Sequence, residues 1–468
     1  MENCLSLCHN MKVSFNSMKG KKILALFFVL PVCLAAAEYR VDTLYSKWVI
    51  DSRMGSFNNK TKTVGFATPD HPQCTATWDY VPGLVAKGIL KAYTQYKDST
   101  WSAYWLEGVR NYADAHMDIT FDEYKGKDRR DDIDWLNAAK IFFELHEHTG
   151  QDMYKEKVES ACDVLSTQHG RIKAPLPGAG GFWHKGGGLV KGYDNQMWLD
   201  GLYMGAAMYG EYVGRYVPED EQAWADIALQ FDTVFHYTWN EEEKLCHHAW
   251  SAAPWQENSF WADPKTGRSA EFWGRGMGWF FAALVDVLEY MPAGVDVNAS
   301  GVDARTRLMG YLEKVADGLK NRQDNESGCW YQLLKYDDTF VAESYNGVAC
   351  GHANYLEASA SSMFTYAYLK AMRLGLLDKG KYADMAVKAY KGLIEEFVVE
   401  NADGTISIVS SCESAGLGGG AKSGEPKYRD GSAAYYLCGY DVPVNDHTEG
   451  KALGSFIMAS LEYELLEK

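Results

Sequence analysis

The sequence has no run of basic residues long enough to follow a nucleic-acid backbone. Lys and Arg together number 46 against 63 Asp and Glu, which gives a formal net charge of −17. Nucleic acid is therefore excluded as a partner, because its binding depends on neutralising phosphates. An acidic surface also repels anionic ligands at long range, so an acidic substrate would need positive charge that is local to a pocket.

The usual signatures of nucleotide, metal and serine-nucleophile sites are missing as well. The chain has no GxGxxG after a strand, no GxxxxGK[ST], no HExxH and no GxSxG. Its cysteines show no CxxC spacing, which argues against a structural zinc site and against a disulfide-dense scaffold. We therefore expect no metal and no cofactor, and we expect cysteines that are mostly free and buried.

Residues 1–37 have the pattern of a secretory signal peptide. Lys19, Lys21 and Lys22 precede an apolar run that begins at Ile23 and closes on three alanines ending at Ala37. The run is too short for a comfortable membrane span, so we expect no stable membrane insertion after cleavage near Ala37. The prediction is an exported protein, periplasmic in a bacterium, with residues 38–468 as one domain.

The remainder of the chain has the pattern of long helices. Residues 83–174 and 293–425 contain no proline, and apolar residues recur at helical spacing in segments 133–145, 153–165 and 224–234. Alternation typical of strands is scarce. This pattern predicts an all-α protein with roughly eleven or twelve helical segments.

Paired helices can stack into an open solenoid or close into a toroid. Repeats of a solenoid resemble one another in sequence, whereas the helical pairs of this chain do not. The connecting loops are rich in Trp, Tyr, His and Gly, as expected if they surround one central pocket. We therefore expect a single-domain (α/α)6 barrel, with Asp152 and Asp220 at helix starts.

The segment that runs from GGFWHK to QMWLDGLYM is the richest in groups that carry chemistry. It combines aromatic residues with His184, Lys185 and the carboxylate of Asp200. Because Asp200 follows Trp198 and Leu199, we expect partial desolvation to raise its pKa and keep it protonated as a general acid. The alternative is an Asp that only caps a helix.

Two further segments contribute candidate residues. WGRGMGW places Arg275 between Trp273 and Trp279, an arrangement suited to a planar carboxylate on a sugar ring, although an Arg stacked on Trp for packing is the alternative. DDIDWLN places Asp134 at a predicted helix start, where the helix dipole favours acidic residues regardless of function. His248 lies in LCHHAW next to another histidine, and adjacent histidines do not make an i, i+4 metal pair.

These motifs and their order carry a resemblance to a known family. GGFWHK, QMWLDGLYM, WGRGMGW, NYLEASASSMF and CESAGLGGG with YRDGSAAYYL resemble glycoside hydrolase family 105, the unsaturated rhamnogalacturonyl hydrolases, and more distantly the unsaturated glucuronyl hydrolases. The resemblance implies an (α/α)6 barrel without metal or cofactor. It also implies hydrolysis of lyase-generated oligosaccharides, such as unsaturated galacturonyl-rhamnose from pectin, that end in a 4,5-unsaturated uronic acid.

The resemblance also assigns roles to residues. The family mechanism protonates C4 of the vinyl ether and adds water at C5, and Asp200 matches the family's acid/base. Asp134 matches a second acidic position that binds sugar hydroxyls. The other positions that match substrate-binding residues are Tyr80, His184, Lys185, His248, Trp273, Arg275 and Trp279. Of these, Arg275 is the candidate for the uronate carboxylate and Trp279 for stacking.

Several alternatives remain open from the sequence. The chain could be an unsaturated glucuronyl hydrolase that acts on another polysaccharide. It could be a glycosidase or epimerase that acts on saturated sugars, or a carbohydrate-binding protein without catalysis. The aglycone sugar and the oligomeric state are not determined by the sequence.

Overall fold

A computed structural model describes most of the chain. The described residues are 37–55, 65–68, 76–186, 193–419, 421–425 and 427–466. Residues 1–36, which hold nearly all of the predicted signal peptide, lie outside this part, so that prediction is not tested by the structure.

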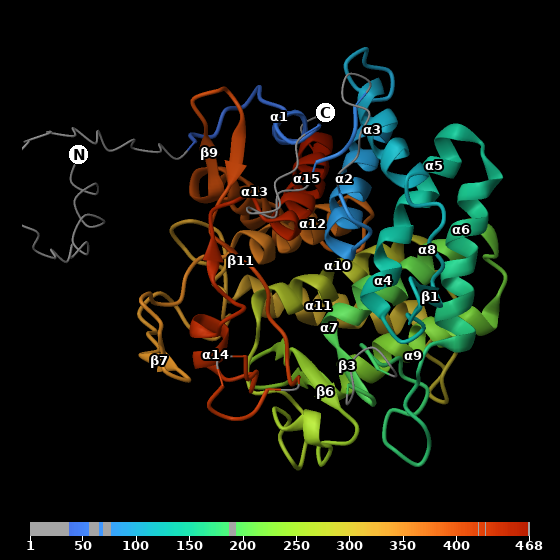
Figure 1. Cartoon of the computed structure of the whole chain (residues 1–468), viewed down its shortest axis with the longest axis vertical. Coiled ribbons are helices and arrows are strands. Elements are labelled where there is room, and N and C mark those ends of the chain that lie inside the picture. The colour runs from blue at the N-terminus through green and yellow to red at the C-terminus, as the bar shows by residue number, and fades with distance from the viewer. Residues whose placement is uncertain are drawn as a thin grey trace, which may run out of the picture. The chain divides into compact units, whose positions relative to one another are not determined.

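Six helices form a closed inner ring (Figure 1). These are α2 (Tyr80–Tyr96), α5 (Ile141–Thr149), α8 (Ala207–Tyr216), α10 (Gly274–Tyr290), α12 (Ala358–Arg373) and α15 (Gly450–Leu466). Helix α15 packs against both α12 and α2, so the last helix of the chain closes the ring against the first inner helix. The short helix α4 (Ile133–Asn137), which precedes α5, contacts the π-helical turn Leu202–Ala206, which follows α7 (Leu199–Gly201) and precedes α8, so these two parts of the ring meet here.

Six outer helices cover this ring. These are α1 (Tyr45–Asp51), α3 (Ala103–Asp114), α6 (Asp152–Asp163), α9 (Glu221–Thr238), α11 (Ala304–Lys320) and α13 (Lys379–Phe397). Each packs mainly against one inner helix: α3 on α2, α6 on α5, α9 on α8, α11 on α10, α13 on α12 and α1 on α15. The fold is an (α/α)6 barrel, as the sequence predicts, and α14 (Ala433–Cys438) lies outside the two rings.

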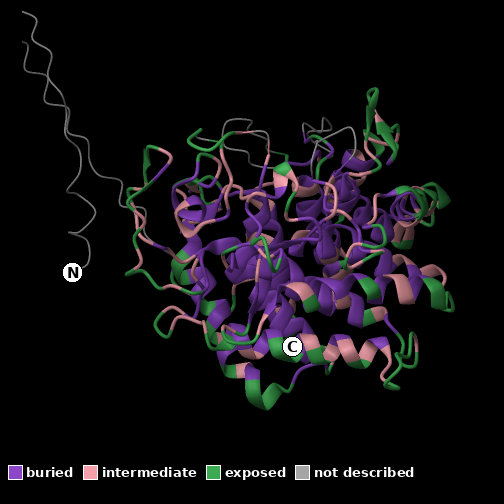
Figure 2. Cartoon of the chain, turned by 90° about the horizontal axis from the view of Figure 1, so that it is seen from below, coloured by how far each residue is buried: buried purple, intermediate pink, exposed green. Residues whose placement is uncertain are grey.

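The two kinds of helix differ in sequence because they differ in burial. Nearly every residue of the inner helix α12 is buried, whereas the outer helix α11 buries a stripe that includes Leu308, Leu312, Val315 and Leu319. Figure 2 shows buried residues gathered in the middle of the protein and exposed ones at its edges. The predicted helix starts are also confirmed: α6 begins at Asp152, and the side chain of Asp220 caps α9 by accepting from an amide of its first turn.

Strands in the described part of the chain are short and form antiparallel pairs. The pairs are β1 (Glu123–Tyr124) with β2 (Lys127–Asp128), β3 (Gln196–Trp198) with β6 (Ala249–Ser251), β4 (Trp239–Asn240) with β5 (Leu245–Cys246), β7 (Ser344–Tyr345) with β8 (Val348–Ala349), β9 (Val398–Glu400) with β10 (Ile406–Ile408), and β11 (Ser411–Cys412) with β12 (Val444–Asn445). They join loops between helices, and the β3–β6 pair positions the candidate site.

The cysteines follow the prediction in part. Cys162, Cys246, Cys329 and Cys412 are free and buried, as expected. A disulfide between Cys350 and Cys438, which are 88 residues apart, was not expected from the sequence. It joins a loop to the end of α14, a proximity that only the fold creates.

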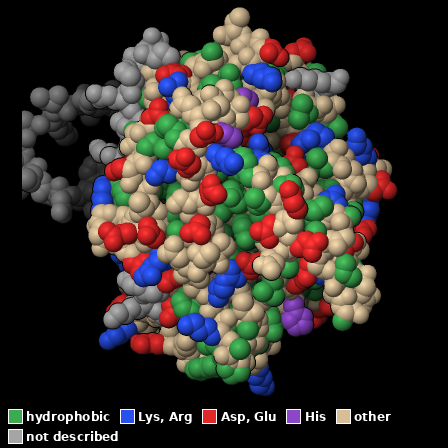
Figure 3. All heavy atoms as spheres, turned by 90° about the vertical axis from the view of Figure 1, so that its right-hand side faces the viewer, with side chains coloured by type: hydrophobic (Ala, Val, Ile, Leu, Met, Phe, Trp, Pro, Cys, Tyr) green, Lys and Arg blue, Asp and Glu red, His purple; other side chains and the backbone are tan. Residues whose placement is uncertain are grey.

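Charged side chains of both signs are dispersed on the surface of the protein. On the face shown in Figure 3, basic side chains are interspersed with acidic ones. None of the helices in the described ranges combines the length and the apolar character of a membrane span.

Candidate active site

The β3–β6 pair brings Asp200 and His248 together from distant parts of the sequence. Trp198, the last residue of β3, lies opposite Ala249, the first of β6. The following amide, of Leu199, donates to the carbonyl oxygen of His248 at 3.0 Å. Asp200 comes one residue after this bond, where the chain turns from β3 into α7, and His248 comes one residue before β6, so the pairing brings the two residues close together.

Asp200, His248 and Tyr436 form a hydrogen-bonded chain. His248 Nε2 lies 3.0 Å from Asp200 Oδ2, and His248 Nδ1 lies 2.6 Å from the hydroxyl oxygen of Tyr436. An ionised carboxylate can only accept, so Nε2 carries a proton and donates it to Asp200. His248 is fully buried, which holds its ring in one orientation toward Asp200.

The pKa of Asp200 is shifted opposite to the expectation from sequence. Burial pushes this pKa upward, but the positive charge of His248 and its hydrogen bond outweigh burial. The pKa of Asp200 therefore lies below its ordinary value of 3.8. The sequence correctly indicates desolvation but does not reveal the histidine, which lies 48 residues away. In the free protein the Asp200 carboxylate is ionised at neutral pH.

A second carboxylate, Asp134, lies close to His184. The amide of His184 donates to Gln196 in β3 at 2.8 Å, so this segment runs beside the same ladder. Lys185 Nζ lies 2.6 Å from Asp134 Oδ2, and His184 Nε2 lies 3.9 Å from Asp134 Oδ1. Both Asp134 and Asp200 act electrostatically on His184. His184 is thus influenced by both carboxylates.

Charge and protonation in this group follow from its burial. Burial lowers the pKa of His184, which favours the neutral imidazole. Burial also opposes the charge of Lys185, but Asp134 and Asp132 outweigh it and raise the pKa of Lys185. The Lys185 ammonium is therefore kept charged beside neutral His184.

A cavity of about 510 Å³ opens beside Asp134 and Lys185. Tyr80 lines it, together with Trp78, Asp79, Arg129 and other residues. Burial raises the pKa of Tyr80 well above 10.0, so its phenol remains a hydrogen-bond donor. Aromatic faces combined with a few charged and hydroxyl groups are suited to a sugar that carries an acidic group.

The position of Arg275 fits a packing residue better than a residue that binds the carboxylate of a substrate. Its side chain is 1% exposed and its guanidinium stacks on Trp273, 4.7 Å from the ring centroid. Arg275 Nη1 donates to the carbonyl oxygen of Cys412 at 2.6 Å and lies 3.8 Å from Glu357 Oε1. The guanidinium thus joins the starts of α10 and α12 to β11, and it does not line the cavity.

The two tryptophans of the same motif are also buried. Trp279 is 1% exposed and packs against the ring of Tyr203 at 4.7 Å inside the barrel, away from the residues that line the cavity. The ring of Trp273 packs against the ring of His248, with 4.6 Å between the ring centroids. The assignment of Trp279 to sugar stacking stays a prediction, and the structure does not place its ring at the cavity.

Two residues of the site were not singled out by the sequence as functional. Trp198 stacks on His184 at 4.3 Å with an interplanar angle of 15°. Tyr436 orients His248, although it is 188 residues away in sequence. Both lie within motifs that carry the family resemblance, so a signal was present, but it did not reveal their partners.

The arrangement can transfer a proton but offers little for a metal. Asp200 can exchange a proton at a fixed position, while Asp134, Lys185 and Tyr80 can bind polar groups of a ligand. Within the described ranges, no group of three or more His, Cys, Asp or Glu is arranged to hold a metal ion.

Comparisons with known proteins point to one family. The sequence model of Glycosyl Hydrolase Family 88 matches residues 49–466. A solved glycoside hydrolase of family 105 from C. acetobutylicum is 33% identical with a TM-score of 0.69, and the match covers 90% of this chain and 100% of that chain. Protein Atu3128 of Agrobacterium fabrum is 34% identical over 215 residues, which are 45% of this chain and 79% of that protein. The unsaturated 3S-rhamnoglycuronyl hydrolase of Formosa agariphila is 25% identical over 171 residues, which are 36% of this chain and 38% of that protein.

Proposed function

The chain belongs to glycosyl hydrolase family 88, and we propose that it removes a 4,5-unsaturated uronic acid from the non-reducing end of lyase-generated oligosaccharides. The proposed substrate is unsaturated galacturonyl-rhamnose. One observation carries the proposal: Asp200, held by His248, and the Asp134–Lys185 pair, which lines the cavity, both act on the same buried residue, His184.

The local charge supports an anionic substrate. In a protein of net charge −17, the cavity still presents the charged ammonium of Lys185. Because the Arg275 guanidinium is occupied inside the protein, we propose Lys185 as the charged contact of the uronate carboxylate. Asp134 and Tyr80 would then bind sugar hydroxyls from the same wall of the cavity.

The proposed reaction is the hydration of a vinyl ether. Protonated Asp200 gives its proton to C4, the oxygen of a water molecule bonds to C5, and the proton lost by this water returns to Asp200. The resulting hemiketal opens by breaking the bond between C5 and the ring oxygen. C1 is then a hemiacetal, which expels the aglycone sugar as a free alcohol.

Asp200 has to gain a proton before this step, because it is ionised in the free protein. A uronate carboxylate bound nearby repels the ionised form of Asp200 and raises its pKa. The substrate thereby favours the protonated acid that its own reaction needs. After the proton returns from water, Asp200 is ready for a second turnover.

The first experiment follows the ultraviolet absorbance of the conjugated C4=C5 bond in unsaturated galacturonyl-rhamnose. We expect the absorbance to disappear while rhamnose is released. Release of rhamnose from the saturated disaccharide would instead establish an ordinary glycosidase, and binding without turnover would establish a carbohydrate-binding protein.

The same assay separates the galacturonyl and glucuronyl alternatives. The double bond makes C4 planar and removes the configuration that distinguishes the two acids, so an enzyme can distinguish only the linkage at C1 and the aglycone. Unsaturated uronides in both linkages to one aglycone should therefore be compared. Faster turnover of the linkage found in glucuronides would replace the proposed substrate with an unsaturated glucuronide.

We also propose that the protein is exported and that cleavage occurs near Ala37. The disulfide between Cys350 and Cys438 supports an oxidising compartment. The intact mass of protein purified from cells tests this proposal, because retention of residues 1–36 would contradict it.

A further inference from the structure

The two carboxylates of the site lie on helices that meet behind it. Asp134 is in α4, which continues through the 3-10 turn Ala138–Lys140 into α5. Asp200 is in α7, which continues through the π-helical turn Leu202–Ala206 into α8. Gly205 of this turn lies directly against α4, since a Cβ at Gly205 would be 2.6 Å from Cδ1 of Ile133.

The π-helical turn changes the hydrogen bond of one carbonyl group. The amide of Ala207 donates to the carbonyl oxygen of Leu202, five residues back. In an α-helix this amide would bond to Tyr203, four residues back. Because of this π-helical turn, the carbonyl group of Tyr203, three residues after Asp200, lacks the amide donor that it would have in an α-helix.

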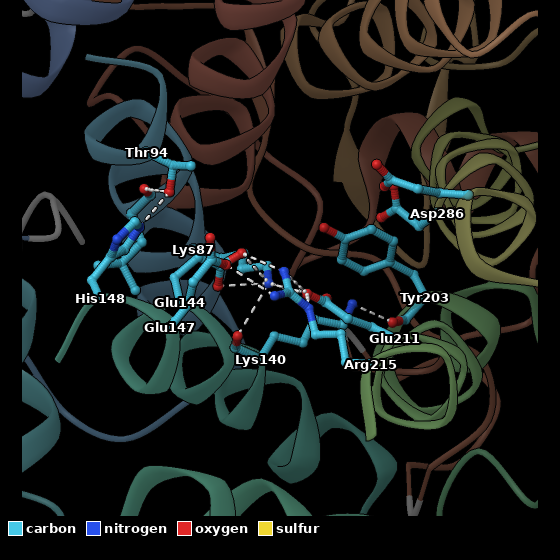
Figure 4. A network of polar contacts seen from close by, with 12 residues as sticks. Lys87, Thr94, Lys140, Glu144, Glu147, His148, Tyr203, Glu211, Arg215 and Asp286 are labelled. Atoms are coloured by element: carbon cyan, nitrogen blue, oxygen red, sulfur yellow. Dashed lines mark hydrogen bonds and ion pairs between the residues drawn. The ribbon is translucent and has the colours of Figure 1, made fainter. Parts of the chain in front are cut away.

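Lys140 supplies a donor to this carbonyl. Its Nζ lies 2.6 Å from the carbonyl oxygen of Tyr203 and 3.5 Å from the centroid of the Tyr203 ring (Figure 4). Lys140 is the last residue of the 3-10 turn that follows α4. One side chain thus connects the helix of Asp134 with the turn that follows Asp200.

Keeping an amine at this position opposes stability. Lys140 is 4% exposed, and burial lowers its pKa to about 7. Nearby Lys87 and Lys91 also disfavour its charge, while Asp286 and Glu211 favour it. Apolar side chains often stabilise such buried positions at least as well as charged groups, so stability alone does not explain a lysine here.

We propose that Lys140 is a positioning residue, which fixes the π-helical turn and thereby sets the Asp200 carboxylate relative to Asp134. This inference rests on the proposed function, because it concerns the geometry of the proton transfer. Lys140 itself is not among the residues that line the cavity beside Asp134 and Lys185.

The test compares Lys140→Met with Lys370→Met. Lys370 is buried in the same network and pairs with Asp286 at 2.6 Å and Glu289 at 2.7 Å, so its loss is a matched control for removing a buried charge. We expect Lys140→Met to lower kcat about 10- to 100-fold, the effect of a misplaced catalytic group, with KM changed less than about two-fold. Lys370→Met should lower Tm and retain kcat.

The outcomes separate this inference from the proposed function. An unchanged kcat in Lys140→Met, or an equal loss of kcat in both variants, would overturn the role of Lys140. If the wild-type protein leaves every unsaturated uronide intact, the proposed function itself fails.

If Lys140→Met does not fold, a glycine substitution tests the same contact between helices. Gly205→Ala places a Cβ against Ile133 and should displace the π-helical turn from α4, which lowers kcat. Gly210→Ala is the matched control, because its Cβ would instead meet Val287 of α10 at 3.0 Å. An unchanged kcat in folded Gly205→Ala would contradict the inference.

Discussion

Replacing Asp200 with Asn tests the centre of the proposed mechanism. The amide is nearly isosteric, and its oxygen can still accept from His248 Nε2, which lies 3.0 Å from Asp200 Oδ2. It cannot carry a proton to C4. Because a general acid contributes about 100- to 10,000-fold to rate, we expect kcat to fall by this factor, or about 3–5 kcal/mol in activation free energy.

Binding and folding should change much less than turnover in Asp200→Asn. The variant loses a charge-assisted hydrogen bond and keeps a neutral one, which costs about 1 kcal/mol of folding free energy. It also removes a negative charge near an anionic ligand, so substrate affinity should be equal or higher. Absorbance of the unsaturated bond measures kcat, calorimetry measures Kd with the intact substrate, and thermal unfolding measures Tm.

Asp134→Asn is the variant with which Asp200→Asn is compared. Asp134 pairs with Lys185 and lines the cavity, so we expect its substitution mainly to raise KM. Near-normal kcat in Asp200→Asn would refute the assignment of Asp200. Equal losses of kcat in both variants would favour a mechanism with two catalytic carboxylates, as in ordinary glycosidases.

Two further variants test the electrostatics and the packing around the site. His248→Gln keeps a donor near Asp200 but removes the positive charge that lowers the pKa of Asp200, while the burial that raises this pKa remains. Because an acid must hold its proton to act, the high-pH limb of kcat/KM should move to higher pH. A shift of this limb to lower pH would contradict the proposed cause. Because the guanidinium of Arg275 is buried, Arg275→Lys should destabilise the protein by about 1–3 kcal/mol through lost buried hydrogen bonds and leave KM nearly unchanged. A raised KM at unchanged Tm would instead support binding of the uronate by Arg275.

The helices could be predicted from sequence because their signals are local. The three segments with helical periodicity became α4 with the start of α5, α6, and α9, and Asp220 caps α9 as its position suggested. The inner ring also follows from composition, since a helix buried on all sides needs apolar or small residues on all sides. Closure of the ring between α15 and α2 has no local signal and was supported by the dissimilarity of the helical pairs, by the aromatic loops and by the family resemblance.

The sequence predicted which residues belong to the site but not which of them contact one another. Asp200 stood out by its neighbours, yet its pKa is set by His248, which reaches it through the register of β3 with β6. Arg275 has the same local signature whether it binds a ligand or a neighbour. Its neighbours Glu357 and Cys412 are 82 and 137 residues further along the chain, so only the fold distinguishes the two.

The low pKa of Asp200 leads to a last prediction, on the difference between two pH profiles. The profile of kcat/KM reports the free enzyme, in which His248 keeps Asp200 ionised at neutral pH, whereas the profile of kcat reports the complex. A bound uronate adds a negative charge and raises the pKa of Asp200, so the high-pH limb of kcat should lie above that of kcat/KM. A neutral amide analogue of the substrate should lose this separation, because it carries no charge to stabilise the protonated acid. If the two limbs coincide for the uronate itself, protonation of Asp200 is not coupled to the charge of the substrate, and selection of uronates would rest on contacts such as that of Lys185 alone.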